Sequence, residues 1–540
     1  MKKKLGTIFM AATLTLALGA CTATKDAGSE ADGGSKKGGE KVLNLNNGSE
    51  PTSFDPVIGF DAVSWNALNN IMEGLTRLGK DNKPAPAAAK SWDISNDGKT
   101  YTFHLRPDAK WSNGDKVKAG DFVYAWKRLL DPKTGSSAAF LGYFIEGAEA
   151  YNTGKGSADD VKVAAKDDQT FEVTLTSAQA YFLSVIANPA FFPVDEKVAK
   201  ENPKWFAEAK SFVGNGPFNL TGWTHDSEMT MKKNDKYWDA KNVKLDKVHW
   251  AMVDDTNTEY QMFKKGDLDK SDVPSDLAES LFKDPELHID DQAGEYFYRF
   301  NLTKEPFQNA NIRKAFAMAV DQKEMVDYVT KNKEKEAYGF VSYGFKDPSG
   351  KDFRETNGDL VKTDPKQAKE LLKKGMQEEG YSKLPQVTLT YSTDDVHKKI
   401  AEALQGMFKK NLNVDVKLAN MEANVFVTEQ KAIKLQLSRS SFLADYADPI
   451  NFLENFQTGH SMNRTGWSNK EYDQLIKDAK SEGDETKRFE LMYKAEKVLF
   501  QDMPIIPIHF YNQVYLLNKS VTGIVYHPVG YLELKWADKK

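Results

Sequence analysis

The stretch that decides the fold is SWDISNDGKTYTFHLRPDAKWSNGDKVKAGDFVYAWKRLLDP, residues 91–132. Residues 102–105 alternate between polar and apolar side chains, which is typical of a strand with one buried face. The Asn-Gly-Asp sequence at 113–115 predicts a turn, because these residues favour turn conformations of the backbone. A helix is expected from Ala119, whose apolar side chains recur at the spacing of one helical face: Phe122, Val123, Trp126 and Leu130. The stretch therefore predicts a unit that mixes α and β structure.

The same two patterns continue along the chain. Alternating runs predict strands at 41–45, 101–105, 171–175, 387–391, 414–418 and 434–437. Helical spacing predicts helices at 312–320 and 400–408, a helix capped by Asp364 with Pro365 at its first position, and a helix that begins with a capping box at Ser468 and Glu471. No Pro-rich or Gly-rich linker follows residue 42, so any separate domains are expected to be joined by more than one crossing of the chain.

Composition restricts the class of protein. The chain has 540 residues, of which 40% are hydrophobic and 11% aromatic, so it contains enough apolar side chains for a packed core. The net charge of −5, with acidic and basic residues interspersed, argues against a general nucleic-acid binder. A single cysteine excludes a disulfide framework and any metal site built from several cysteines.

That cysteine lies at the end of a targeting segment. Three lysines at 2–4 precede an apolar run at 5–18, which is the pattern of a secretory signal peptide and is short for a membrane span. The sequence Leu-Gly-Ala-Cys at 18–21 resembles the lipobox of bacterial lipoproteins, in which the cysteine carries the lipid. We therefore expect a signal peptide at 1–20, lipidation of Cys21 and a flexible, Gly-rich and Ser-rich tether at 21–41. A plain signal peptide with a chance cysteine is the alternative.

Catalytic and metal motifs are weak. Residues 74–80 have the spacing of a phosphate-binding loop, but Asp81 stands where Ser or Thr would ligate magnesium, and a helix end with a turn is the favoured interpretation. Asp93 begins a run like a calcium loop, but His104 occupies the position of the bidentate carboxylate, so a β-turn at 96–98 is favoured. We expect no cofactor, no metal and no catalytic residues. A solute receptor, a hydrolase and a structural surface protein remain open.

A resemblance to a known family narrows this choice. Residues 91–132 resemble the signature region of the family 5 extracytoplasmic solute-binding proteins, the peptide-binding components of ABC importers. Further segments match at 214–218, 234–238, 311–315 and 444–449. The resemblance spans about residues 42–536 and implies an α/β fold of the periplasmic-binding-protein type, with two lobes, a hinge and an inserted third domain.

The resemblance also implies domain boundaries. Lobe I would take residues 42–70, 190–296 and 511–540, the inserted domain II would take 71–189, and lobe III would take 297–510. The chain would then cross the hinge twice, which agrees with the lack of a linker.

Carried over residue by residue, the resemblance predicts a peptide site in the segment 439–445. Asp445 would take the α-amino group of the ligand, and Ser441 and Leu443 would pair with its backbone. A turn or helix-capping carboxylate before Pro449 is the alternative for Asp445. Such a site suits a general carrier, because the backbone and the amine are common to all peptides.

Six further residues complete the predicted site. Arg439 matches a position that faces the C-terminal side of the ligand, with a structural salt bridge as the alternative. Phe442 would line the cleft or pack in the core, and His397 would lie near the ligand C-terminus or on a helix surface. Phe60, Asp61 and Ala62 align with the opposite wall. Ala423 and Arg299 replace an aromatic and an acidic cleft residue of enteric relatives, which predicts a different preference for peptide length and charge.

The sequence thus predicts a lipid-anchored, non-enzymatic and monomeric receptor that captures oligopeptides outside the cell. It would deliver them to the permease and ATPase subunits of an ABC importer. With nine arginines against 64 lysines and a lysine-containing tether, a Gram-positive host is expected. A specialised receptor for a peptide pheromone, a murein peptide or a nickel chelate is the alternative, and a surface hydrolase is a more distant one.

Overall fold

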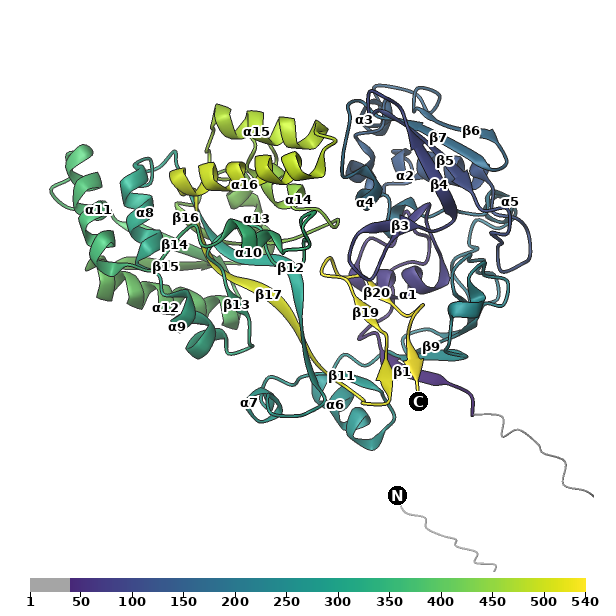
Figure 1. Cartoon of the computed structure of the whole chain (residues 1–540). Helices are drawn as coiled ribbons and strands as arrows, with labels where there is room; N and C mark the ends of the chain where they lie inside the picture. Colours follow the sequence, from purple (N-terminus) through teal and green to yellow (C-terminus); the bar gives the residue numbers. More distant parts are fainter. Residues whose placement is uncertain (1–38) are drawn as a thin grey trace, which may run out of the picture. The chain divides into compact units, whose positions relative to one another are not determined.

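Three main β-sheets organise residues 39–540, the part of the chain that this computed structural model describes (Figure 1). Cys21, the expected signal peptide and residues 21–38 of the expected tether lie outside the described residues. The first sheet has four strands in the order β1 (Val42–Asn46), β10 (Lys247–Ala251), β9 (Glu228–Lys233) and β8 (Phe218–Thr224). β1 and β10 are parallel although some 200 residues separate them, so this sheet joins the start of the described chain to its middle.

The second sheet includes the strands formed by residues 89–105. Its strands are β4 (Ala89–Ile94), β5 (Thr100–Leu105), β7 (Thr170–Thr174) and β6 (Val163–Asp167), in that order. The helix α2 (Ala119–Leu130) follows as predicted and packs Trp126 against Phe171 of β7, with 4.8 Å between the ring centroids. Phe122, Trp126 and Leu130 are fully buried, whereas Val123 is half-buried.

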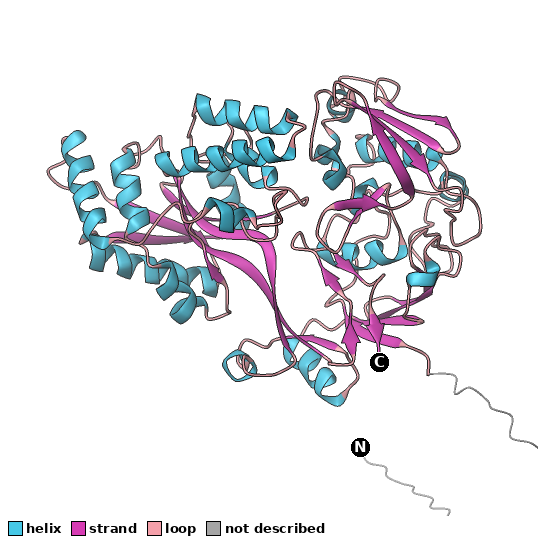
Figure 2. Ribbon diagram, in the orientation of Figure 1, coloured by secondary structure: helices cyan, strands magenta, loops and turns pink. Residues whose placement is uncertain are grey.

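The third sheet is the largest. Its strand order is β11 (Lys270–Asp272), β17 (Ile505–Leu517), β12 (Leu287–Phe300), β16 (Leu437–Leu443), β14 (Val387–Ser392) and β15 (Val416–Met421), and β13 (Lys335–Glu336) also pairs with β17. β12 and β17 are long antiparallel partners that pair from Leu287 with Leu516 to Arg299 with Ile505. Figure 2 shows this pair of strands extending from the helix-covered sheet toward the rest of the described chain.

The remaining elements are short or cover these sheets. The helices are α1 (Ala62–Ile71), α3 (Ala148–Asn152), α4 (Phe182–Val185), α5 (Glu196–Glu201), α6 (Thr256–Lys265), α7 (Ala278–Leu281), α8 (Ala310–Met318), α9 (Gln322–Glu324), α10 (Phe353–Asn357), α11 (Pro365–Glu378), α12 (Asp395–Leu412), α13 (Ala423–Lys431), α14 (Ile450–Leu453), α15 (Lys470–Ser481) and α16 (Glu485–Asp502). The minor strands are β2 (Thr76–Leu78), β3 (Pro84–Pro86), β18 (Val521–Thr522), β19 (Val525–Tyr526), β20 (Leu532–Glu533) and β21 (Asp538–Lys539). Within residues 39–540, no helix has the length and apolar character needed to cross a bilayer.

Most predicted elements are confirmed within two residues. Asp364 caps α11 by accepting from the backbone of Lys366 and Gln367, and Pro365 is its first residue, as expected. The turn before residue 98 is also confirmed, because the amide of Gly98 donates to the carbonyl of Ser95.

Three local predictions are wrong. The capping box at Ser468 is displaced by one residue, since Asn469 accepts from the backbone amides that open α15. The expected strand 434–437 begins only at Leu437, because the amide of Lys434 donates to the carbonyl of Glu429 and closes the end of α13. Residues 74–80 contain the strand β2 rather than a helix end, since α1 already ends at Ile71.

The domain boundaries stay a prediction. The sheet topology shows which strands lie at the predicted boundaries. The second sheet and the β2–β3 hairpin lie wholly within residues 71–189. The predicted boundaries at 296 and 510 fall inside β12 and β17, the two strands that pair along their length. With these boundaries, the two strands would carry both crossings of the expected hinge.

Candidate functional site

The segment predicted to bind peptide lies at the open edge of a strand. β16 pairs with β12 along its whole length, from Leu437 to Leu443. On its other side only its first two residues pair with a strand, Leu437 and Ser438 with β14. Among the described residues, no strand pairs with residues 439–443 on that side. We call this stretch the open edge.

The main-chain groups at the open edge follow from strand alternation. Ala444, directly after β16, donates its amide to the carbonyl of Ala293 on the β12 side at 2.8 Å. Successive residues point their N–H and C=O groups to opposite sides, so Ser441 and Leu443 direct theirs to the open side. The carbonyl of Arg439 also points there and accepts from Gln430 Nε2 at 2.8 Å. No described residue bonds to the main-chain groups of Ser441 and Leu443 on this side, so the two residues predicted as backbone partners offer free main-chain groups.

Asp445 lies two residues beyond the open edge and is fixed by its backbone. Its amide donates to Asn451 Oδ1 at 2.7 Å, and its carbonyl accepts from Asn188 Nδ2 at 3.3 Å and from the Tyr531 hydroxyl at 3.2 Å. Burial raises the pKa of the carboxyl to about 6, the nearby Glu454 adds to the rise, and the Asn451 side chain opposes it.

The capping alternative for Asp445 is not what the structure contains. The helix α14 begins at Ile450, and it is Asp448 whose carboxylate accepts from the amide of Ile450, at 2.9 Å. Asp448 also pairs with the buried guanidinium of Arg488. The helix start is thus satisfied by a neighbour, and the carboxylate of Asp445 is not used for it.

Arg439 and His397 both lie next to Tyr296. The Arg439 guanidinium lies 5.0 Å from the ring centroid of Tyr296, whose hydroxyl is 3.2 Å from His397 Nδ1. Burial, helped by the charge of Arg439, lowers the pKa of His397 to about 4, with Asp394 opposing the change. Within the described chain no carboxylate lies within 4 Å of Arg439, and its Nε is buried without a hydrogen-bond partner. The structural salt bridge considered for Arg439 is therefore not present there.

The side chains of Phe442 and Leu443 point to different environments. The Phe442 ring packs in the core, 5.0 Å from Phe452 and 6.3 Å from Phe340 between centroids. This placement favours the core-packing alternative for its side chain. Leu443 is 52% exposed, so the end of the open edge is accessible.

The predicted opposite wall is built around the start of α1. Asp61 caps this helix by accepting from the amide of Ser64 at 2.8 Å and from its hydroxyl at 2.9 Å. Phe60 packs edge-on against Trp65 at 5.1 Å, and Trp65 packs in the same way against Tyr531 at 5.5 Å. Since Tyr531 also binds the carbonyl of Asp445, this series of contacts connects the two predicted walls. Ala62 is exposed and forms the first turn of the helix.

Several residues of this arrangement were not predicted from the sequence. Asn188, Tyr531 and Asn451 position the backbone of Asp445, and they are spread over more than 340 residues of sequence. Tyr296 links Arg439 to His397, but in sequence it is one of several aromatic residues in an apolar strand. Only the pairing of β12 with β16 brings it there.

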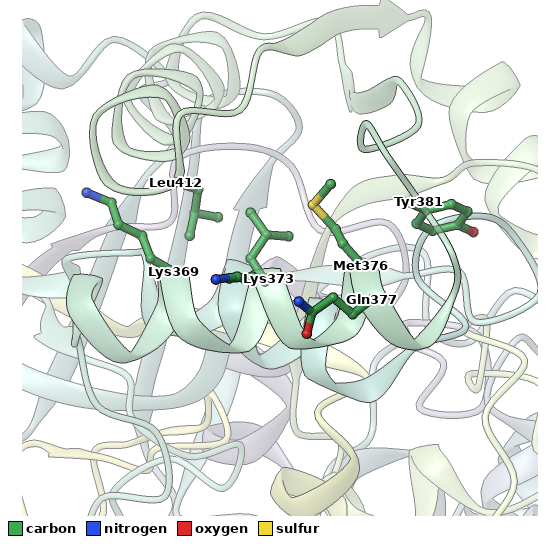
Figure 3. Close-up of a pocket in the computed structure, with 7 residues that line it drawn as sticks. Lys369, Lys373, Met376, Gln377, Tyr381 and Leu412 are labelled. Carbon is green, nitrogen blue, oxygen red and sulfur yellow. The ribbon is translucent and has the colours of Figure 1, made fainter.

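Two hollows of the described surface differ in their distance along the chain from this site. A hollow of about 260 Å³ along α11 contains none of the predicted residues; Figure 3 shows its lining, Lys369, Leu372, Lys373, Met376, Gln377, Tyr381 and Leu412. A larger cavity of about 410 Å³ is bordered by residues 447–449, which directly follow the Asp445 region, and by Tyr181 and Arg488. Among residues 39–540, no group of three or more His, Cys, Asp or Glu is placed to hold a metal ion.

The sequence of this chain is similar to those of known proteins. The sequence profile of the bacterial extracellular solute-binding proteins, family 5 (middle), matches residues 83–464. The dipeptide-binding protein DppE of Bacillus subtilis is 65% identical over 538 residues, which is 99% of each chain.

Solved structures are similar to this chain over almost its whole length. MppA, a periplasmic murein tripeptide-binding protein in its unliganded open form, matches with a TM-score of 0.82 and 30% identity, covering 93% of this chain and 98% of the other. OppA of Listeria monocytogenes bound to peptide matches with a TM-score of 0.71 and 34% identity, covering 93% and 99%.

Proposed function

Because this chain belongs to the bacterial extracellular solute-binding proteins of family 5, we propose that it binds short peptides at the open edge of β16. Members of this family are substrate-binding receptors of ABC transporters and not enzymes. The relatives named for peptide binding, DppE and OppA, support a peptide as the solute.

The observation that carries the proposal is the open edge itself. An extended peptide adds to such an edge through main-chain hydrogen bonds, which every peptide sequence can form. Ser441 and Leu443 each offer one N–H and one C=O group, and Gln430 closes the edge at Arg439. Backbone pairing is therefore limited to a short stretch of ligand. This stretch is about three residues long, from the residue that pairs with Leu443 to the residue that pairs with Ser441.

Asp445 would hold the ligand's α-amino group. A carboxylate that is partly removed from water and lies next to Glu454 gains from a cationic partner, as its raised pKa indicates. The ammonium group would donate to it through charge-assisted hydrogen bonds. With the amine at Asp445 and the peptide passing Leu443 before Ser441, the ligand runs antiparallel to β16.

Arg439 would face the C-terminal part of the ligand. Its guanidinium has no carboxylate partner in the described chain, and a peptide carboxylate would supply one. His397 stays neutral above its lowered pKa, so it would contribute a hydrogen bond and not a charge. Phe60 and Ala62 would form the opposite wall, and Asp61 would hold that wall by capping α1.

Closure of the two predicted lobes about β12 and β17 would cover the bound peptide. The higher TM-score with an unliganded open form supports an open state for the structure described. We further propose that Cys21 carries a lipid that holds this receptor, as a monomer, on the outer face of the cell membrane of a Gram-positive host. There it would pass peptides to the permease and ATPase subunits of an importer.

Mass spectrometry of the bound ligand tests the proposal. Residues 40–540, which form one compact unit, would be purified without denaturant, then denatured, and the released small molecules identified. A mixture of short peptides supports a general peptide receptor, whereas a single species supports a specialised one. Calorimetric titration of an emptied sample with trialanine follows; absence of binding to trialanine and to all released species contradicts the proposal.

A further inference from the structure

Three arginines that lack a carboxylate partner surround the open edge. Of the nine arginines in the chain, Arg77, Arg128, Arg354 and Arg488 pair with Asp or Glu side chains. Arg313 donates to four backbone carbonyls, and Arg106 lies 3.6 Å from the ring centroid of Trp238. The other three are Arg299, Arg439 and Arg464, and none of them has a carboxylate within 4 Å in the described chain.

Arg299 and Arg464 lie together on one face of the sheet. Arg299 is 2% exposed, and its Nε donates to Ser440 Oγ at 2.9 Å and its Nη1 to the carbonyl of Met462 at 2.6 Å. Arg464 is half-buried and donates to Gln430 Oε1 at 3.1 Å and to Met462 Sδ at 3.4 Å. The two cations therefore share Met462 as a neighbour, and both contact side chains that adjoin the open edge.

Neither of these guanidinium groups is neutralised. Burial and the charge of Arg464 lower the pKa of Arg299 to about 9, with Glu295 opposing the change. Arg464 Nε is buried without a hydrogen-bond partner in the described part of the chain. A buried and a half-buried cation with no carboxylate within 4 Å in the described chain are unfavourable, and a carboxylate placed between them would relieve both.

Strand geometry decides which ligand side chains reach this face. Ser440 lies opposite Phe297 in the pairing with β12, and Phe442 lies opposite Glu295, so these side chains share the face of Arg299. Ser441 and Arg439 lie on the other face, with Tyr296 and Tyr298. A ligand whose first and third residues pair with Leu443 and Ser441 places its second and fourth residues opposite Phe442 and Ser440.

We propose that Arg299 and Arg464 form a subsite for an acidic side chain at an even-numbered position of the bound peptide. This inference rests on the proposed function, because it requires the peptide to pair with the open edge. The ligand class is then short peptides with Asp, Glu or another carboxylate at position two or four. Arg439 serves the opposite face and is not part of the subsite.

Positional variants of one tetrapeptide test this subsite by calorimetry with the full-length protein. The ligands are tetra-alanine and its variants with Glu or Gln at position two, three or four. We expect Glu to bind more tightly than Gln by about ten- to a hundredfold at position two or four, the range for a hydrogen bond to a charged group. The variant R464Q should reduce this preference to about threefold or less.

The controls separate this inference from the proposed function. K434Q removes one exposed positive charge from the turn before β16, and it should leave the preference unchanged. R299Q is a second test; if it does not fold, R464Q alone decides. Binding of tetra-alanine without any preference for Glu at even positions overturns the subsite but keeps the peptide receptor. A preference for Glu at position three alone, abolished by R439Q, also overturns it.

Discussion

The substitution D445N tests the assignment of the amine anchor most directly. It keeps the shape of the side chain and removes its charge, so an ammonium group would lose its ionic partner. Removing one partner of a buried charge pair costs about 2 to 5 kcal/mol, and the half-buried position of Asp445 favours the lower end, roughly thirtyfold in affinity. Trialanine affinity at pH 7.5, measured by calorimetry, gives this value.

The raised pKa of Asp445 adds a prediction for pH. With a pKa of about 6 in the empty protein, the carboxyl is ionised at pH 7.5 and mostly protonated at pH 5. A bound ammonium group lowers that pKa, so binding at low pH must release a proton, and affinity should fall about tenfold between pH 7.5 and pH 5. D445N should show no such fall. H397N should keep it, because His397 is already neutral over this range.

The stability of the empty protein should change with pH in the opposite direction to the peptide affinity. A carboxyl whose folded pKa lies above its ordinary value destabilises the folded state when it is ionised, and stability is regained as the pH falls through 6 toward 3.8. D445N should therefore raise the melting temperature at pH 7.5 while it weakens binding. Unchanged trialanine affinity in D445N, or a pH dependence that persists in this variant, would refute the assignment.

Three further outcomes are expected. S441P removes one N–H group from the open edge and should lower trialanine affinity by about tenfold, whereas S441A keeps this group and should bind normally; equal affinities would contradict backbone pairing. E295Q should raise the melting temperature more at pH 8 than at pH 5. Both carboxylate oxygens of the fully buried Glu295 lack partners in the described chain, and burial raises the pKa of this carboxyl. An equal shift at both pH values would contradict this. C21A should release the protein into the growth medium, as measured by immunoblotting of cell and medium fractions, and retention on the cells would contradict lipid anchoring.

Local patterns were sufficient to predict most of the elements. The apolar spacing of α2 and the cap of α11 depend on residues within one or two turns, so the sequence carries the whole signal. The prediction failed where neighbouring residues compete for one role. Ser468 and Asn469 are both good caps, and only the backbone conformation at Asn469 selects it.

The site was predictable only in part, for a related reason. Residues 439–445 lie in one segment, so a resemblance places them together. The partners that fix this segment, such as Asn188, Gln430 and Tyr531, come from distant elements and have ordinary side chains. The side-chain direction of Phe442 likewise follows from strand register, which sends it into the core although its neighbours reach the open edge.

The pairing of Arg299 with Ile505 has a consequence for protein engineering. The chain leaves one long strand and returns in the other at directly opposed positions, so the 205 residues from Phe300 to Pro504 form a cassette whose two ends are adjacent. In an antiparallel pair such positions are about 5 Å apart. The cassette of a relative could therefore replace this one through two neighbouring splice points. Such chimeras would combine the peptide preference of one parent with the remaining surface of the other.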